Sequence, residues 1–233
     1  MGLNSENVVD LQIVCDIETT CLSNAADYLE PVQPARNLKD PEKIKADIEQ
    51  RTAERDSKLA LDWNVGRVAA LGTWTERAGT QVAVCANEQQ EAIALTCFWL
   101  DCRYKTIVGF NIKGFDLKFM IQRSRYLGID YPLLDLGKYT RKGIVDLFSE
   151  LTFSDGAYDQ GAMRRTLRAF AKRFGLPVTD TLIGAEMPAL IEAGEWAQVI
   201  AHVTSDVELT LALARKLRVI APLPDPVLAG AVA

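Results

Sequence analysis

The chain has 233 residues, of which 48% are hydrophobic and 24% are charged, values typical of a soluble globular protein. No apolar run approaches the roughly 20 residues that span a bilayer, and the N-terminus lacks a signal-peptide pattern. The five Cys lack Cys-x-x-Cys spacing, so neither a disulfide framework nor a zinc site is indicated. We therefore expect a reducing, cytoplasmic setting and no membrane partner.

The single histidine, His202, excludes His-rich metal sites. The chain also lacks a Gly-x-Ser-x-Gly elbow and a Gly-rich phosphate loop, which leaves carboxylate chemistry. The net charge of −5 is unevenly distributed, because residues 103–173 carry 14 Lys or Arg and 7 Asp or Glu. This segment has a net charge of +7 and the rest of the chain −12. It is a candidate phosphate-contacting surface, with solvated helix faces as the alternative.

Residues 11–20 predict a first strand, because apolar and β-branched residues lead into two acids one residue apart. Side chains alternate across a strand, so Asp16 and Glu18 share one face and Ile17 points away. Two adjacent carboxylates repel each other unless a cation lies between them, and their oxygens suit Mg²⁺ or Mn²⁺. The alternative is a surface strand that carries two solvated acids.

A charged helical insertion is expected at about 24–64. Residues 21–38 are irregular, and Asp40 followed by Pro41 predicts the start of a helix that runs to about Leu61. This helix has only a thin apolar stripe, so it is a surface strut or a mobile flap.

The remaining pattern alternates strands and helices. Strands are predicted at 66–74, 81–85, 106–111 and 144–148, and helices at 88–102, 116–127, 164–174, 188–192 and 195–217. In the helix at 116–127 we expect Lys118, Arg123 and Arg125 outside. We expect the first three strands to form an antiparallel meander. The prediction is one α/β domain over 8–220 and a flexible tail over 221–233.

Two later motifs carry further candidate site residues. Gly109–Phe119 has the pattern of a strand, a tight turn and a helix, and Asp116 begins that helix. His202 and Asp206 stand four residues apart on the mostly apolar face of the last helix, where a buried carboxylate needs a partner. A packed core histidine and a structural ion pair are the alternatives for these two residues.

In chain order the motifs are Asp16-x-Glu18, Asn111-x-x-x-Phe115-Asp116 and His202-x-x-x-Asp206. This order resembles the three exonuclease motifs of the DEDD superfamily of 3′–5′ exonucleases. The similarity covers roughly Val9 to Leu217 and is strongest to stand-alone phage and bacterial exonucleases related to the proofreading domain of family B DNA polymerases. It implies an RNase H-like three-layer fold, with helices on both sides of a five-stranded mixed sheet made of the antiparallel meander plus parallel strands.

The resemblance also implies roles for individual residues. Asp16, Glu18, Asp116 and Asp206 would hold two divalent ions, Mg²⁺ or Mn²⁺, and His202 would be the catalytic base. Ile17, Thr19, Asn111 and Phe115 would position the terminal nucleotide, and we expect Arg164, Arg165 and Arg168 to contact the substrate backbone. We expect Asp146, a fifth acid near a strand end, to be structural.

One spacing departs from the superfamily pattern. Members with a His base usually place it five residues before the last Asp, and members with Tyr place it four before. His202 precedes Asp206 by four, so a His occupies the Tyr position.

The expected function is release of nucleoside 5′-monophosphates from 3′ ends, preferably of single-stranded DNA. The alternatives are a DEDD-type exoribonuclease and a non-catalytic nucleic-acid-binding or polymerase-accessory module. A DNA polymerase or another replication or repair protein is a possible partner.

Overall fold

The computed structural model describes residues 11–137, 142–153 and 166–221. A five-stranded sheet with strand order β3-β2-β1-β4-β5 forms its centre. Strand β1 pairs antiparallel with β2 and parallel with β4, so the sheet is mixed. This arrangement, with helices on both sides, confirms the predicted RNase H-like fold. The strands are β1 Gln12–Cys21, β2 Gly66–Thr75, β3 Gly79–Val84, β4 Thr106–Gly109 and β5 Ile144–Asp146.

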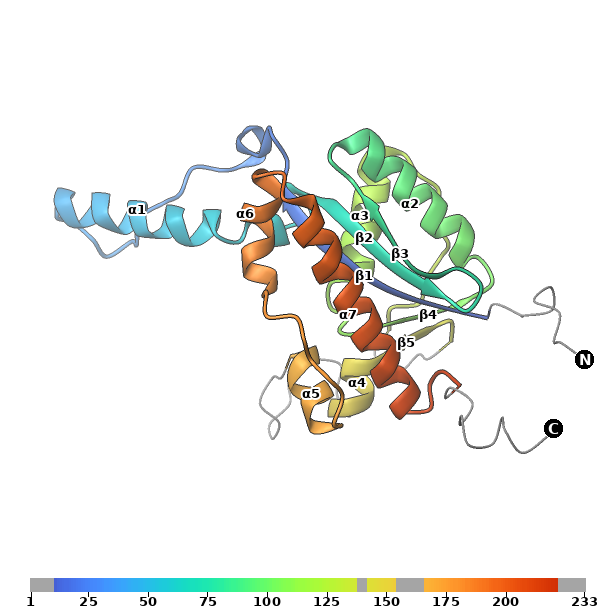
Figure 1. The fold of residues 1–233 in the computed structure, drawn as a ribbon. Helices are drawn as coiled ribbons and strands as arrows, with labels where there is room; N and C mark the ends of the chain where they lie inside the picture. The colour runs from blue at the N-terminus through green and yellow to red at the C-terminus, as the bar shows by residue number, and fades with distance from the viewer. Residues whose placement is uncertain (1–10, 138–141, 154–165, 222–233) are drawn as a thin grey trace, which may run out of the picture.

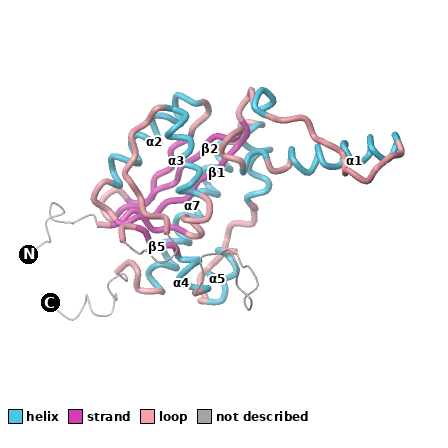
Figure 2. The backbone as a smooth tube through the Cα atoms, turned by 180° about the vertical axis from the view of Figure 1, so that it is seen from behind, coloured by secondary structure: helices cyan, strands magenta, loops and turns pink. Residues whose placement is uncertain are grey.

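Two apolar clusters, one on each face of the sheet, form the core. Along β1, Ile13, Cys15 and Ile17 pack into the cluster that contains α2 and α3, and Val14 packs into the cluster that contains α5, α6 and α7. Figures 1 and 2 show α7 crossing the sheet and α2 and α3 beside it. The helices are α2 Glu88–Cys102, α3 Asp116–Leu127, α4 Leu147–Thr152, α5 Leu167–Arg173, α6 Met187–Glu192 and α7 Trp196–Lys216.

Gly72 on β2 lets α7 approach the sheet closely. A Cβ at this position would lie 2.4 Å from Val203 Cγ1 and 2.7 Å from Val207 Cγ2, closer than real Cβ contacts. Gly72 pairs with Asp16 in the register of β1 and β2. Only glycine therefore fits where α7 passes over the strand pair that carries the first acid.

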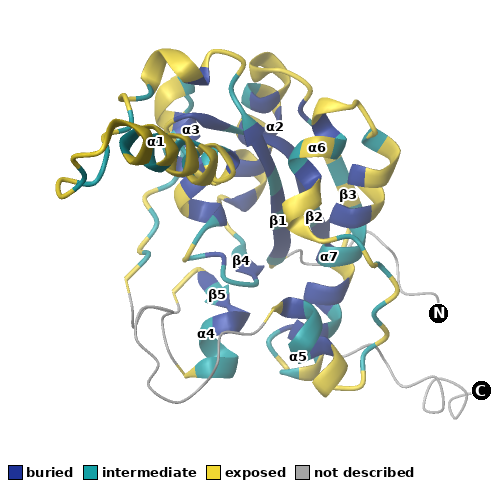
Figure 3. Ribbon diagram, turned by 90° about the vertical axis from the view of Figure 1, so that its left-hand side faces the viewer, coloured by how far each residue is buried: buried dark blue, intermediate teal, exposed yellow. Residues whose placement is uncertain are grey.

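The segment expected as an insertion contains a helix that projects from the body of the molecule (Figures 1 and 2) and is coloured exposed or intermediate in Figure 3. Helix α1, Pro41–Asp56, begins at Asp40, whose side chain accepts hydrogen bonds from two backbone N–H groups. It ends at Asp56 rather than near Leu61, and a separate 3₁₀ turn follows at Leu59–Leu61. None of its 16 residues is buried. A second short 3₁₀ turn lies at Ala25–Tyr28.

Three local predictions were wrong. The expected strand at 144–148 ends at Asp146, because the Asp146 side chain caps helix α4. The expected strand at 106–111 ends at Gly109, and Asn111 adopts the left-handed conformation with φ of 59°. Arg123, expected on the outside of α3, is 2% exposed.

The predicted helix at 164–174 is seen as α5 from Leu167, with Thr166 as its N-cap, and residues 154–165 lie outside the described part of the chain. The same holds for residues 222–233 of the expected tail. Across the described ranges, the helices are all too short or too polar to cross a membrane.

Candidate active site

Strand β1 supplies the first two candidate acids. The inward-facing residues Ile13, Cys15 and Ile17 fix the pleat, so Asp16 and Glu18 point to the opposite face, the one that α7 covers. The register between β1 and β2 shifts between Glu18 and Thr19, where Ala69 of β2 has no partner on β1, so the strand pair is irregular directly after the second acid. Irregularities such as β-bulges re-aim side chains and are common beside active sites.

Asp116 reaches the same place from the start of α3. Its Oδ1 accepts a hydrogen bond of 3.2 Å from the backbone N–H of Ile17, between the two strand acids. The turn that precedes it is held by Asp146, which accepts from the backbone N–H groups of Asn111 at 2.9 Å and Lys113 at 3.0 Å. These contacts agree with the structural role expected for Asp146.

Helix α7 brings His202 and Asp206 to the β1 acids. The His202 ring is 2% exposed, and its Nε2 lies 3.2 Å from Glu18 Oε1 and 3.8 Å from Asp206 Oδ2. The i, i+4 spacing therefore places both residues at one site, as predicted.

Two further residues complete the cluster, and one of them was not predicted from the sequence. Asp180 Oδ2 lies 2.6 Å from His202 Nδ1 and 2.8 Å from Arg168 Nη2. Arg168 Nη2 is also 3.8 Å from Asp206 Oδ1. Asp180 stands in a segment without regular secondary structure, Leu176–Ile183, in which the even-numbered residues are half-buried and the odd-numbered ones exposed. That alternation, Leu176, Val178, Asp180 and Leu182 facing inward, is the signal that could have identified it.

The acids of the cluster destabilise each other's charged forms. Burial, then the neighbouring Asp116, Glu18 and Asp206, raise the pKa of Asp16 well above its usual range. Burial raises the pKa of Asp116 to about 7. The charges of Asp146 and Glu18 act in the same direction, and hydrogen bonds from backbone N–H groups act against it. The pKa values of Glu18 and Asp206 are also raised, chiefly by burial. The site thus holds more negative charge than its own residues neutralise.

The same negative charges stabilise the charged form of His202. Burial by itself lowers the pKa of its imidazole, but the hydrogen bonds to Glu18 and Asp180 and the charge of Asp206 outweigh it and raise the pKa to about 9. Among the described residues, and without a bound cation, the imidazolium is therefore one of two positive groups inside the cluster, together with Arg168.

The residues present suit a divalent cation. Oδ1 of Asp206 is buried and has no hydrogen-bond partner within the described part of the chain, and the pKa values of the four predicted metal acids are all raised. Asp180, His202 and Asp206 place one ligand atom each within 4.8 Å of one another. That trio shares only Asp206 with the predicted metal set, and the guanidinium of Arg168 already lies 2.8 Å from Asp180. The negative charge that a cation would balance is thus that of the acids on β1 and α3, which are Asp16, Glu18 and Asp116.

The residues predicted to bind substrate are distributed around this cluster. Ile17 and Thr19 are buried on β1, and the backbone N–H of Ile17 donates to Asp116. Asn111 and Phe115 are half-buried in the turn before Asp116. Arg168 lies inside the cluster, Arg164 and Arg165 lie outside the described residues, and their contacts with a substrate backbone stay predictions.

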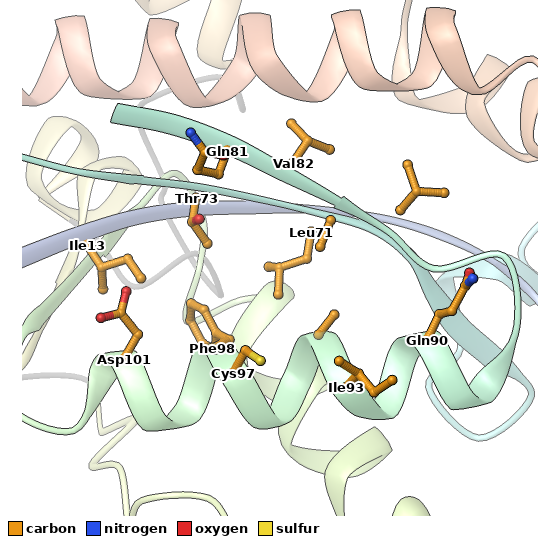
Figure 4. Close-up of a pocket in the computed structure, with 13 residues that line it drawn as sticks. Ile13, Leu71, Thr73, Gln81, Val82, Gln90, Ile93, Cys97, Phe98 and Asp101 are labelled. Carbon is orange, nitrogen blue, oxygen red and sulfur yellow. The ribbon is translucent and has the colours of Figure 1, made fainter. Parts of the chain in front are cut away.

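A groove in the described part of the chain lies away from these acids. It has a volume of about 640 Å³ and runs between α2 and β3, with Ile93, Cys97, Phe98 and Gln81 among its lining residues (Figure 4). Ile13 points into this groove from β1, so the groove is on the sheet face opposite to the acids. It is not part of the candidate active site.

Comparison with protein families finds a match over a little under half of the chain. Residues 68–168 match the exonuclease domain of DNA polymerase family B. This match confirms the predicted relationship to proofreading exonucleases and the predicted enzyme class, a 3′–5′ exonuclease. Of the four acids predicted to hold metal, Asp116 lies inside the matched stretch.

A solved structure extends the similarity to most of the exonuclease fold. The family B DNA polymerase from the hyperthermophilic archaeon Pyrobaculum calidifontis superposes with a TM-score of 0.58 and 20% sequence identity. The similarity covers 90% of this chain and 25% of the polymerase chain, so it shows a shared fold over about a quarter of that protein. No curated protein matches the chain.

Proposed function

We propose that the protein is a two-metal-ion 3′–5′ exonuclease that prefers single-stranded DNA and releases nucleoside 5′-monophosphates. The observation that supports the proposal is the raised pKa of the buried Asp16, to which the charges of Asp116, Glu18 and Asp206 contribute, together with a buried Asp206 oxygen that has no hydrogen bond within the described residues. The match to the exonuclease domain supports the reaction class.

The four acids Asp16, Glu18, Asp116 and Asp206 are the residues that would hold Mg²⁺ or Mn²⁺. When bound, such ions lower the pKa of water and stabilise negative charge on a phosphate and a leaving oxygen. The chain's own contribution is placement: β1 sets the spacing of two acids, the Ile17 N–H fixes Asp116, and α7 adds Asp206. Asn111 and Phe115, in the turn before Asp116, are placed to orient the terminal nucleotide.

His202 is the proposed base for the attacking water. Its Nε2 faces Glu18 and Asp206, and its Nδ1 is turned away toward Asp180, so Nε2 is the nitrogen that can take a proton at the acid site. The pKa of about 9 belongs to the metal-free form, in which the facing carboxylates are uncompensated. His202 stands at the superfamily's Tyr position, and the ring nevertheless reaches the β1 acids.

The function is tested by incubating the purified protein with 3′- or 5′-labelled single-stranded DNA, duplex DNA and RNA, with Mg²⁺, Mn²⁺ or EDTA. We expect mononucleotides released from the 3′ end of single-stranded DNA with either metal, and none in EDTA. Faster cleavage of RNA would instead identify an exoribonuclease. Binding without cleavage under every metal condition would identify a non-catalytic nucleic-acid-binding module.

The role of His202 is tested by two substitutions. His202→Ala should lower kcat by about 10²–10⁴-fold, the range for loss of a positioned base, and leave DNA binding intact. His202→Tyr should recover part of this loss, because the four-residue spacing is the one that Tyr-type members use. Equal rates for His202→Ala and wild type would make His202 a packed core residue.

A further inference from the structure

The segment between α5 and α6 lies along α7 and presents one acid to it. Its even-numbered residues, Leu176, Val178 and Leu182, pack against the apolar cluster that contains α7. Asp180 occupies the fourth inward position of the same alternation. An apolar residue would satisfy packing at such a position, so a carboxylate there requires a polar partner.

Every oxygen of that carboxylate is engaged. Oδ1 accepts a hydrogen bond of 3.0 Å from the backbone N–H of Leu182, which fixes the side chain to its own segment. Oδ2 lies 2.6 Å from His202 Nδ1 and 2.8 Å from Arg168 Nη2. The side chain is 15% exposed, so these contacts are mostly shielded from water.

The two nitrogens of the His202 ring thus face different groups. Nδ1 faces Asp180 and lies 3.3 Å from Arg168, and Nε2 faces Glu18 and Asp206. A carboxylate on Nδ1 fixes the ring orientation and holds a proton on that nitrogen, which is how partners of functional histidines select one tautomer.

We propose that Asp180 is a positioning residue for the exonuclease reaction, because it holds Nδ1–H of His202 and so presents Nε2 to the acid site. Arg168 contacts the same Oδ2 of Asp180 and reaches toward Asp206. This inference rests on the proposed function, in which Nε2 takes the proton of the attacking water.

The charge state of Asp180 supports this role. Partial burial acts to raise the pKa of its carboxyl, but the Leu182 N–H bond and the contacts with His202 and Arg168 outweigh burial and lower the pKa. Asp180 is therefore an acceptor, unlike the β1 acids, whose pKa values are raised.

The chain contains one histidine, so ¹⁵N labelling of histidine rings reports on His202 alone. In the metal-free wild-type protein we expect a downfield Nδ1-bound proton that exchanges slowly with water. Asp180→Ala should lose this resonance, and Asp180→Asn, whose amide oxygen can still accept, should keep it at a changed shift. An unchanged resonance in Asp180→Ala, or none in wild type, overturns the proposal.

A matched control separates positioning from loss of a loop contact. Asp135 also accepts through Oδ1 from the backbone N–H two residues ahead, Gly137, at 2.8 Å, and it is exposed. Asp180→Ala should lower kcat by about 10- to 100-fold, the range for partners that orient functional histidines, with KM for DNA within about twofold. Asp135→Ala should leave both unchanged, and Asp180→Asn should recover part of the loss.

The outcomes distinguish this inference from the proposed function. A wild-type protein without metal-dependent cleavage contradicts the function, whatever the ring spectrum shows. An active wild type whose kcat is the same in Asp180→Ala and Asp135→Ala contradicts the positioning role alone. If Asp180→Ala does not fold, as judged by thermal unfolding, Asp180→Asn supplies both the spectrum and the kinetic comparison.

Discussion

Two clusters of charged side chains lie on opposite faces of the sheet, and each is built around one arginine. On the α2 and α3 face, Arg123 donates two hydrogen bonds to Glu91, at 2.9 and 2.8 Å, and one to Glu88 at 2.7 Å. Glu91 also accepts from the backbone N–H of Val68 at 2.8 Å. On the α7 face, Arg168 and His202 stand against five acids: Asp180, Glu18, Asp206, Asp16 and Asp116.

The difference between the clusters separates a structural role from the proposed catalytic one. The Arg123 cluster is closed, because the fully buried Glu91 has its charge paired and its oxygens hydrogen-bonded. The acid cluster around Arg168 is open, with raised pKa values and, within the described residues, a buried Asp206 oxygen that has no hydrogen bond. A closed cluster stabilises only the fold, whereas an open one can gain a cation.

The largest effect on activity is expected for Asp16→Asn in the open cluster. Cleavage should fall by more than the roughly 100-fold typical of lost orienting partners, because a proposed metal ligand is removed. The unfolding free energy in EDTA should not fall, since one repelling charge disappears. Added Mg²⁺ should raise the Tm of wild type more than that of the variant. Asp135→Asn serves as the exposed control. If Mg²⁺ raises the Tm of wild type and of Asp16→Asn by the same amount, the two-metal account is contradicted.

The reverse pattern is expected for Arg123→Met in the closed cluster. Leaving Glu91 buried without its cation should cost about 3–5 kcal/mol of unfolding free energy. Denaturant unfolding measures this loss, and kcat of the remaining folded enzyme should stay near the wild-type value. Glu88→Gln is the matched control, because Glu88 is 53% exposed and an exposed pair contributes about 1 kcal/mol or less. A large loss of kcat without a loss of stability would show that the Arg123 cluster also contributes to catalysis.

The raised pKa values of the open cluster should also make the stability of the protein depend on pH. The folded pKa of Asp116 is raised to about 7 and that of His202 to about 9, so each stabilises the fold below its unfolded pKa and loses this contribution as pH rises through the folded value. In EDTA the protein should therefore lose on the order of a few kcal/mol between about pH 4 and 9. Stabilisation by Mg²⁺ should grow over the same range. Asp116→Asn should remove the part of this stability loss that occurs at the lower pH values. An unfolding free energy that does not change with pH in EDTA would contradict the excess of negative charge in the site.

The smallest effect on stability is expected for the projecting helix. Replacing residues 36–57 by a short Gly-Ser linker removes α1, which has no buried residue. The unfolding free energy should change by less than about 0.5 kcal/mol, as for surface changes. The KM for long DNA substrates should change more than kcat. Precipitation or loss of cooperative unfolding would show that the helix belongs to the core.

The sequence pattern was sufficient where contacts are local or periodic. The alternation in β1 placed Asp16 and Glu18 on one face, and the spacing in α7 placed His202 beside Asp206. Prediction failed where a partner is distant in sequence. A charged Arg123 was expected outside because burying a charge is costly, and the Glu91 that compensates it is 32 residues away on α2. Asp180 was missed for the same reason, since its partner His202 is 22 residues further along.

The docking of α7 across β1 has a consequence for how the enzyme is made. During synthesis, Asp16, Glu18 and Asp116 are available long before His202 and Asp206, which join the site only when the last helix packs beside Gly72. A chain that ends before α7 has three of the acids, but neither the fourth nor the base. On the proposed function, nuclease activity therefore requires that α7 has been translated and has packed against the sheet.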